Sequence, residues 1–508
     1  MRRTLLVAAA LAMPAMSFAW TAPVGIPAPP FPADLDVQRP TLPSPWSAET
    51  TGFYFVSKSN CSDSRSLGTP SAPRCSIPSS VSAGAVIALS GTISDMETVS
   101  YRGTAQAPVW VMGYDASAKP TITQVWTFSG SYIIADSLNF QVNTRDSVEL
   151  GGDHIMIRNT SIANPYGAAN GANYATYGSF TVFYKNTVSQ CGDWQHTGAD
   201  IDRQGIKVVG GTSDLWILDS TFFHCQSDGV QIGDQNNSSS QINRVYVGRN
   251  TAYENLQFGF WVKNATDVIF SENTIYNQNR STESGPGGGL GGQYDPKYIW
   301  FIANHVYDSN TGIHVASSSN GGGGPWYAIG NVIQGITTGG SCNAYNAGAI
   351  SYRNEGGMTV LFNTVYDSDF FIGAPPSAGT VTVRNNIFAS KKNTSCSGFV
   401  LEKSVTHDYN LFSVASYNPG GESNAVTGDP KFIAAGSNFA LQSSSPAVNK
   451  GNPTEEAAFA AYQSRYGVDL RYDLAKTRRP QSTRWDIGAF ESTANVISPN
   501  PPTNLRAN

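Results

Sequence analysis

The chain has 508 residues, enough for a large core, but only 14% of them are charged, against roughly 25% in an average soluble protein. Gly is abundant, at 50 residues, which favours many short strands separated by turns. The net charge of −5 and the absence of any basic run argue against a nucleic-acid-binding protein and against attraction to an anionic membrane surface.

The first 19 residues have the pattern of an export signal. Arg2 and Arg3 precede the apolar run LLVAAALAMPAM, and Ser17-Phe18-Ala19 fits a small-residue cleavage site. No later stretch is apolar for long enough to span a bilayer. We therefore expect a secreted or periplasmic monomer whose residues 20–50 form an N-terminal extension.

Six cysteines fit an oxidising compartment. Cys61 and Cys75 bracket a loop rich in Ser, Gly and Pro, and we expect them to form a disulfide. The remaining cysteines allow two further pairs, Cys191 with Cys225 and Cys342 with Cys396. No two cysteines have the spacing of zinc ligands, so a zinc site is not expected.

The middle of the chain repeats a short motif of the form SENTIY. Its copies recur at intervals of roughly 22 to 33 residues, a period typical of solenoids, and they contain short strands with no helical period. The pattern predicts an all-β fold, a right-handed parallel β-helix over residues 51–412, with an earlier copy near Asp136. We interpret the shared polar position as structural, because Asn side chains stacked in a turn hydrogen-bond one another. In this alignment the position is held by Asn159, Asn186, Asp219, Asn250, Asn273, Asn304, Asn331, Asn363 and Asn385.

Both ends of the repeat region resemble secreted pectate-lyase-like β-helix proteins. The stretch from FYFVSKSNCSDS to AVIALSGT is similar to their N-terminal coil, and GDPKFIAAGSNFALQSSSPAVNKGN with RPQSTRWDIGAFE resembles a C-terminal coil common among them. The resemblance covers most of residues 51–492 and implies the architecture rather than the reaction. We expect residues 413–495 to form the C-terminal coil and cap, and residues 496–508 to be a linker-like tail.

A second short strand lies about twelve residues before several of the Asn positions, for example GFWVK. Because side chains alternate along a strand, one set of positions points into the core and the next set points outward. The expected core set is Ile206, Val208, Val230, Ile232, Phe260, Val262, Ile313, Val315, Ile350 and Tyr352.

The alternation predicts two outward columns, neither of which contains a carboxylate. The first is Lys207, Gln231, Trp261, Gly292, His314 and Ser351, and the second is Val209, Gly233, Lys263, Tyr294, Ala316 and Arg353. Since coils stack about 4.8 Å apart, Lys263 and Tyr294 are expected to be neighbours, with Arg353 roughly 14 Å from Lys263. Each of these side chains, taken alone, also fits an ordinary solvated surface residue.

Together they fit β-elimination on a uronic-acid glycan, and they resemble the residues used by β-helix polysaccharide lyases of the alginate-lyase and chondroitinase-B type. Lys263 is the expected base, Tyr294 or His314 the acid, and Arg353 or Lys207 the group that neutralises the substrate carboxylate. Gln231 and Trp261 are expected to bind sugar. Calcium often assists in such lyases, and its candidate ligands here are Asp228, Asp234 and Glu254.

Three alternatives remain open at this stage. A β-helix glycoside hydrolase would use paired carboxylates, but the polygalacturonase-type signatures are missing from the strand face. A C5-epimerase would use the same base and acid without cleavage. A glycan-binding or adhesive solenoid would use Trp261 and Tyr294 only as stacking platforms.

Overall fold

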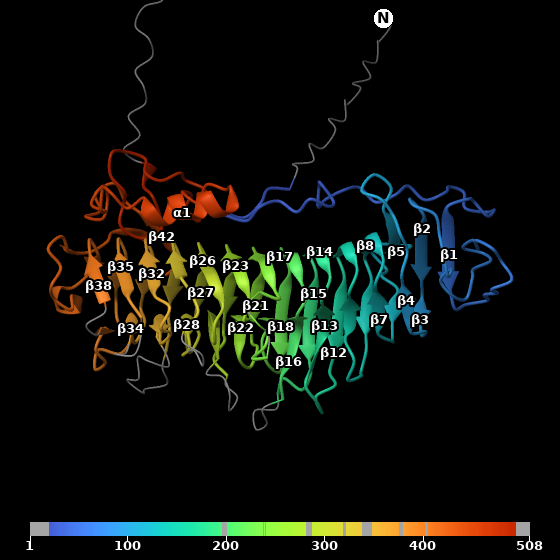
Figure 1. Cartoon of the computed structure of the whole chain (residues 1–508), viewed down its shortest axis with the longest axis horizontal. Helices are drawn as coiled ribbons and strands as arrows, with labels where there is room; N and C mark the ends of the chain where they lie inside the picture. Colours follow the sequence, from blue (N-terminus) through green and yellow to red (C-terminus); the bar gives the residue numbers. More distant parts are fainter. Residues whose placement is uncertain are drawn as a thin grey trace, which may run out of the picture.

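The computed structural model describes residues 20–195, 201–236, 238, 240–280, 287–317, 322–337, 348–374, 379–401 and 405–493. Its strands stack into three long, all-parallel sheets that run the length of the molecule (Figure 1). Each coil of the chain contributes one strand to each sheet in turn, so the fold is the predicted parallel β-helix.

The first sheet has 14 strands in the described residues and most of the six-residue strands of the solenoid. They are β1 (Phe53–Ser57), β2 (Val86–Ser90), β5 (Val109–Gly113), β8 (Ser131–Asp136), β11 (Asp153–Arg158), β14 (Ser179–Tyr184), β17 (Ser213–Leu218), β20 (Asn243–Gly248), β23 (Thr266–Ser271), β26 (Lys297–Ile302), β29 (Trp326–Ile329), β32 (Met358–Leu361), β35 (Val381–Arg384) and β38 (Val405–Asp408).

The second sheet, with 12 strands, contains the predicted outward columns. Its strands are β4 (Glu97–Val99), β7 (Trp126–Phe128), β10 (Val148–Leu150), β13 (Gly171–Thr176), β16 (Arg203–Val208), β19 (Val230–Ile232), β22 (Phe258–Val262), β25 (Gly288–Gly292), β28 (Ile313–Val315), β31 (Ile350–Tyr352), β34 (Ile372–Ala374) and β37 (Phe399–Leu401).

The third sheet has 14 strands and lies between the other two along each coil. They are β3 (Thr92–Ile93), β6 (Thr121–Ile122), β9 (Asn139–Gln141), β12 (Ser161–Asn164), β15 (Thr187–Cys191), β18 (Thr221–Cys225), β21 (Thr251–Tyr253), β24 (Thr274–Tyr276), β27 (His305–Tyr307), β30 (Val332–Gln334), β33 (Thr364–Tyr366), β36 (Ile387–Ala389), β39 (Leu411–Phe412) and β40 (Val426–Thr427). The last strand lies past residue 412, where the sequence predicted the end of the solenoid.

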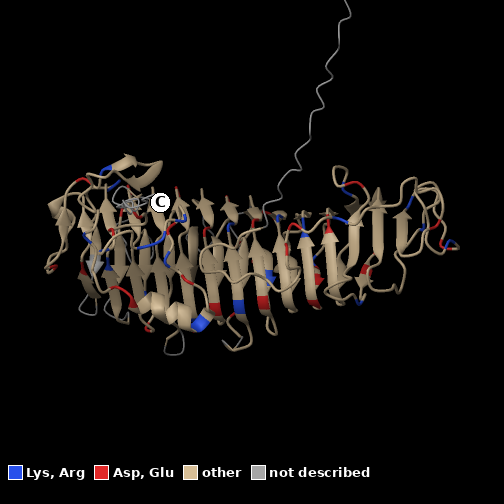
Figure 2. Cartoon of the chain, turned by 90° about the horizontal axis from the view of Figure 1, so that it is seen from above, with Lys and Arg blue, Asp and Glu red and all other residues tan. Residues whose placement is uncertain are grey.

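Alternating side chains from all three sheets fill the interior. All ten residues that the sequence assigned to the core of the second sheet are buried, among them Phe260 and Tyr352. Charged residues are sparse along the strands, and most of the solenoid is free of them (Figure 2). The core is therefore continuous from one end of the stack to the other.

The predicted polar ladder is present at the turn between the first and third sheets. Asn273 donates from Nδ2 to Asn304 Oδ1 at 2.9 Å, and Asn304 donates in the same way to Asn331 at 2.9 Å. Equivalent amide contacts join Asn250 to Asn273 and continue along Asn363, Asn386 and Asn410. These side chains are at most 1% exposed, so each bond replaces water that the turn excludes.

Three members of the predicted ladder were assigned one residue too early. The stacked positions are Thr160, Ser220 and Asn386, rather than Asn159, Asp219 and Asn385. Asn159, Asp219 and Asn385 instead occupy the preceding position, with φ of 52°, 50° and 58°. Asn and Asp tolerate this left-handed conformation better than most residues, which explains why the two positions look alike in sequence.

A column of glycines lets the second sheet approach the third closely. It consists of Gly205, Gly229, Gly259, Gly289 and Gly312 on consecutive coils. A Cβ atom at any of them would lie closer than 3.0 Å to the carbonyl oxygen of the following coil. The absence of side chains therefore fixes the path of the second sheet at this edge.

The outer face of the first sheet is covered by both ends of the chain (Figure 1). Residues 20–46 lie along it, and the Trp216 indole donates to the Pro27 carbonyl at 2.8 Å. Helix α1 (Ala457–Tyr466) lies on the same face and ends at Gly467, whose φ is 72°. The Tyr462 hydroxyl of this helix donates to the Gly25 carbonyl at 2.6 Å, which joins the two covering segments.

The C-terminal segment contains three further short elements: η1 (Ala415–Tyr417) and the antiparallel strands β41 (Phe432–Ala434) and β42 (Asn438–Leu441). No helix in the described part of the chain is long and apolar enough to cross a membrane. The disulfides Cys61–Cys75 and Cys191–Cys225 are both present, as predicted. Cys342 lies outside the described residues.

Candidate functional site

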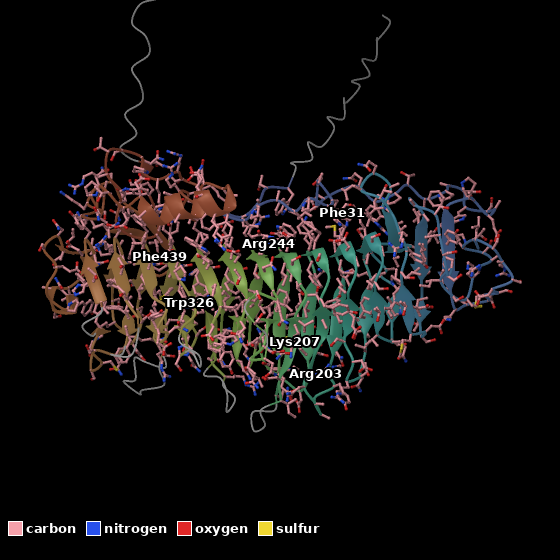
Figure 3. The ribbon with its side chains drawn as sticks, viewed as in Figure 1. Phe31, Arg203, Lys207, Arg244, Trp326 and Phe439 are labelled. Carbon is pink, nitrogen blue, oxygen red and sulfur yellow. A yellow bond between two sulfur atoms is a disulfide. The ribbon has the colours of Figure 1, made fainter. Side chains whose placement is uncertain are left out.

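The outer face of the second sheet, called here the site face, carries most of the predicted site residues. Lys207 lies on this side of the solenoid, away from Phe31 of the covering segment (Figure 3). Lys207, Gln231 and Trp261 are in register on β16, β19 and β22. His314 and Ser351 continue the same column on β28 and β31.

The predicted alignment is wrong by one residue on β25. Gly291, not Gly292, lies in register between Trp261 and His314, and Gly292 is in register with the core residue Val262. The Gln293 amide continues the ladder from the Val262 carbonyl at 3.0 Å, as the Lys263 amide does from Ile232 at 2.7 Å. Gln293, rather than Tyr294, is therefore the neighbour of Lys263 in its column.

The site face is also not free of carboxylates, contrary to the prediction. Glu149 on β10 occupies the same column as Lys207, two coils earlier. Asp228 is in register with Phe258 and accepts its backbone N–H at 2.9 Å. Only 1% of Asp228 is exposed.

The floor of the site face is aromatic. The Trp261 indole stacks on Phe258 at a centroid distance of 4.1 Å and lies nearly parallel to the His314 ring at 6.0 Å. A Cβ at Gly291 would overlap with Trp261 Cζ3, so the glycine leaves the space that the indole fills. Trp261 is only 5% exposed, and it therefore forms part of the floor rather than a projecting sugar platform.

His314 is held within this floor. Its Nδ1 contacts the Ser351 hydroxyl, and the ring is 7% exposed. Burial and, to a smaller extent, the positive charge of Arg353 lower the pKa of His314 to about 4. The imidazole is consequently neutral at pH 7.

Lys263 follows β22 directly and is half-buried. No carboxylate of the described residues forms a salt bridge with it. Burial raises the pKa of the nearby Asp228 carboxyl to about 7, while Lys263 lowers it and Asp202 raises it. Lys263 therefore places an ammonium or amine group on the site face close to a carboxyl that is partly protonated at neutral pH.

Tyr294 lies outside the predicted column. Its φ of 66° turns the chain out of the strand, and its hydroxyl donates to Gln235 Oε1 at 3.2 Å. Gln235 belongs to the β19 coil and Tyr294 to the β25 coil, so the phenol crosses the β22 coil that carries Lys263. The backbone is fixed by Asn354 Nδ2, which donates to the Tyr294 carbonyl at 3.0 Å.

The other predicted binding residues differ in how strongly the protein itself engages their side chains. Gln231 is 3% exposed, accepts a bond from Gln204 Nε2 at 3.4 Å and donates to the Gly233 carbonyl at 3.1 Å. Its amide is thus engaged within the protein. Lys207 is half-buried and forms no salt bridge with a described acid, whereas Arg353 lies three coils from Lys263.

The predicted calcium ligands do not converge. Asp228 and Asp234 lie on opposite sides of β19, six residues apart in an extended segment, or about 20 Å. Glu254 is at the end of β21 in the third sheet, where it pairs with His224 Nε2 at 2.9 Å. Among the residues that the structure describes, no three His, Cys, Asp or Glu side chains gather as metal ligands, so these residues do not fit a shared calcium site.

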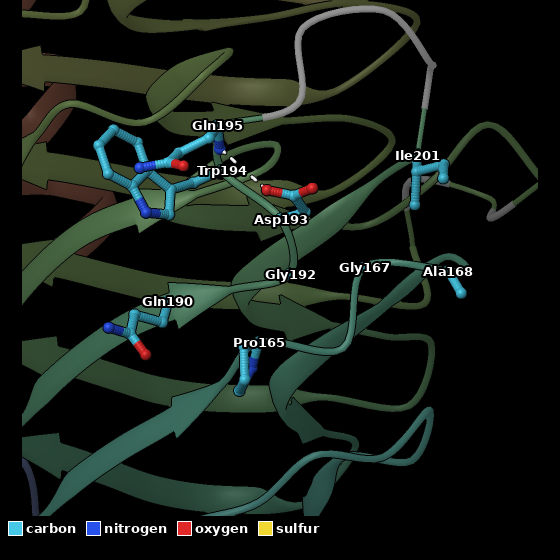
Figure 4. A pocket seen from close by; sticks show the side chains of 9 residues that line it. All are labelled: Pro165, Gly167, Ala168, Gln190, Gly192, Asp193, Trp194, Gln195 and Ile201. Atoms are coloured by element: carbon cyan, nitrogen blue, oxygen red, sulfur yellow. Dashed lines mark hydrogen bonds between the residues drawn. The ribbon is translucent and has the colours of Figure 1, made fainter.

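A cavity of about 680 Å³ lies at the turn that leads into β16, and sequence reasoning did not predict it (Figure 4). Its lining includes Asp193, Trp194 and Gln195. The Trp194 indole stacks on His224 at 3.7 Å, and Arg280 donates to the Trp194 carbonyl at 2.9 Å. The sequence signal for this feature is the Cys191–Cys225 pair, which anchors the loop that begins at residue 192.

Residues 123–277 match the family model described as the right handed beta helix region. Among solved structures, the PL6 family alginate lyase AlyGC is 15% identical, with a TM-score of 0.53 over 71% of this chain and 52% of that chain. The alginate lyase AlyF-OU02 is 13% identical, with a TM-score of 0.51 over 73% of this chain and 87% of that chain. A GH87 α-1,3-glucanase from Streptomyces thermodiastaticus, 12% identical, has a TM-score of 0.44 over 68% of this chain and 65% of that one.

The chain spans about half the length of AlyGC. No curated protein matches the sequence. At these identities the likeness establishes the fold alone: the chain is a right-handed parallel β-helix protein, as the sequence predicted, and shares that fold with polysaccharide lyases.

Proposed function

We propose that this protein is a polysaccharide lyase that cleaves a uronic-acid-containing glycan by β-elimination on the site face. The observation that carries the proposal is the position of Lys263. It is half-buried, forms no salt bridge with a described acid, and lies on a coil that the Tyr294 phenol crosses. A base and an acid on one side of a sugar are what the reaction requires.

In this mechanism Lys263, as the neutral amine, removes the proton from C5 of the uronic acid. The electron pair of that C–H bond forms the C4–C5 double bond, and the bond from C4 to the glycosidic oxygen breaks. Tyr294 donates its hydroxyl proton to the departing oxygen. Both side chains return to their starting protonation states by exchange with water, so the step needs no co-reactant.

The carboxylate beside C5 must be neutralised while negative charge develops on it. Lys207 and Arg353 face the same side of the sheet, two and three coils from Lys263, so their positive charges act on this carboxylate through space rather than by contact. His314 is too deeply buried and too far along the sheet to act as the acid. The closed aromatic floor of Phe258, Trp261 and His314 excludes water from beneath the sugar.

A second candidate is hydrolysis by the Asp202 and Asp228 carboxyls. Asp202 raises the pKa of Asp228, and the two carboxyls accept hydrogen bonds from the adjacent residues Gln257 and Phe258. Both are engaged, however: Asp202 Oδ1 accepts bonds from Ser227 and Gln257, each at 3.0 Å, and Asp228 accepts the Phe258 amide. Hydrolysis would release reducing ends without an unsaturated product.

The proposal is tested by incubating the secreted protein with alginate, polygalacturonate and glycosaminoglycans and recording ultraviolet absorbance. A lyase forms a conjugated unsaturated uronate that absorbs, whereas a hydrolase or an epimerase does not. Reducing ends that appear without absorbance would favour the Asp202–Asp228 alternative. A change in uronate composition without cleavage would favour an epimerase, and binding without any product would indicate a glycan-binding solenoid.

A further inference from the structure

Three cationic side chains lie along the site face on six consecutive strands, from β16 to β31. Lys207 is on the β16 coil, Lys263 on the β22 coil and Arg353 on the β31 coil. With coils about 4.8 Å apart, the steps along the solenoid axis are about 10 Å and about 14 Å. We call Lys207, Lys263 and Arg353 the cationic track.

Lys263 and Arg353 are too far apart to act on the same sugar. Two side chains about 14 Å apart along the axis do not hold the carboxylate of one sugar while it reacts. A hexopyranose in an extended chain advances by about 5 Å, close to one coil spacing of about 4.8 Å. Lys207 and Arg353 are therefore spaced to meet carboxylates two and three sugars away from the sugar at Lys263.

The cationic track has a defined end at Glu149. This residue is in the column of Lys207, two coils earlier, and its carboxylate accepts a bond from the Tyr177 hydroxyl at 3.3 Å. A uronate placed over β10 would face a like charge, which is unfavourable. At the other end the column continues from Ser351 to Gly373, which has no side chain.

We infer that the site face binds a segment of six uronic acid residues parallel to the solenoid axis. Lys207 and Arg353 hold carboxylates on either side of the cleaved sugar, and Glu149 prevents extension of the bound segment onto β10. The inference rests on the proposed function for its central sugar and adds the length, direction and limit of the bound glycan. Because sugars on both sides of the cleaved bond are held, cleavage falls within the chain rather than at its end.

The other carboxyl groups close to the track do not interrupt it. Asp228 is almost fully buried just before the first residue of β19. Asp202 directly precedes β16 and accepts hydrogen bonds from Ser227 and Gln257. Lys263 and Arg353 directly follow the last residues of β22 and β31, and Lys207 is the penultimate residue of β16, so the glycan is expected to follow this end of the strands.

The test measures affinity for uronic acid oligomers of three to eight residues by calorimetry with Lys263→Ala, so that no substrate is consumed. We expect affinity to rise steeply up to six residues and then to level off. Arg353→Gln and Lys207→Gln, each added to that background, are expected to weaken hexamer binding about ten-fold and to leave trimer binding less affected. Lys450→Gln, on the exposed surface of the C-terminal cap, is the matched control.

The variant Glu149→Gln tests the proposed limit of the bound segment directly. Removing its charge is expected to let octamers bind more tightly than hexamers, a difference that the parent does not show. Affinity that increases evenly with length in every variant would overturn the inference. The result is separable from the proposed function: length-dependent binding without turnover by the parent would overturn only the lyase proposal, and turnover without length dependence would overturn only the track.

Discussion

The Tyr294 hydroxyl donates to Gln235 Oε1 at 3.2 Å across two coils of the solenoid. The bond holds the phenol over the β22 coil, where Lys263 lies, although Tyr294 is not the neighbour of Lys263 in its column. Tyr294 thus lies outside the strand register, and its hydrogen bond spans the coil of the proposed base.

Tyr294→Phe is expected to lower kcat on the best uronate substrate by about 100-fold or more, because the leaving oxygen loses its proton donor. KM should change little, since the ring remains. Gln235→Leu is the control: it releases the phenol but keeps the acid, and a smaller loss is expected. Equal activity of Tyr294→Phe and the parent would remove Tyr294 from the mechanism.

Gly291→Ala tests the packing of the aromatic floor. The new methyl group would overlap with Trp261 Cζ3 and the His314 carbonyl oxygen, so the floor must shift or the strand must bend. We expect a loss of about 1–3 kcal/mol in the free energy of unfolding, together with reduced turnover. Chemical denaturation followed by tryptophan fluorescence measures it, and an unchanged midpoint would show that the indole does not lie across Gly291.

Asn304→Ala tests the polar ladder. The fully buried amide accepts bonds from Asn273 and donates to Asn331 Oδ1 and the Phe270 carbonyl. Its removal leaves those groups without partners, and we expect about 2–4 kcal/mol of destabilisation. Asn236→Ala, at an exposed turn, should have a far smaller effect on the melting temperature. Similar melting temperatures for the two variants would contradict a structural role for the ladder.

Stability is also expected to depend on pH through Glu491 in the C-terminal cap. Burial raises the pKa of this carboxyl to about 7, whereas the unfolded chain has an ordinary value near 4.5. The folded state therefore binds more protons between these values, and this contribution to stability is present at low pH and is lost as pH rises toward 7.

The comparison of the parent with Glu491→Gln isolates that contribution, because the lowered pKa of His314 acts in the opposite direction over part of the range. Relative to the variant, the parent should become more stable as pH falls from 7.5 to 5. Melting curves at several pH values measure the difference. A difference that does not change with pH would show that Glu491 titrates normally.

Much of the fold was predictable because each coil repeats the same alternation. Phe260 and Val262 mark the inward positions of β22 clearly, and their neighbours in other coils do the same. The predicted register of the site is wrong at β25, where the alternation of large and small side chains is nearly absent. This strand is Gly288–Gly292, and Leu290 is its only residue with a large side chain. The turn after it is also one residue longer than the turn after β22, which displaced Tyr294 by one position.

The rest of the structure depends on contacts between distant segments. Trp20 donates from its indole to Asp219 Oδ2 at 3.0 Å, 199 residues away, and nothing in residues 20–50 has a period that reveals this partner. The cavity beside Trp194 also depends on a distant contact, the stacking of Trp194 on His224. Glu149 was not predicted, because its strand, β10, precedes the coils whose alternation predicted the column of Lys207.

The most direct test of the proposed reaction is the rate of unsaturated product formation by Lys263→Ala on the best uronic acid polymer. We predict a loss of several orders of magnitude in this rate, because the C5 proton has no other acceptor. The melting temperature and the β-sheet circular dichroism should not change. Lys450→Ala should retain the parent rate. Near-parental turnover by Lys263→Ala would contradict the account and place the base elsewhere, with Asp202 and Asp228 as the next residues to replace.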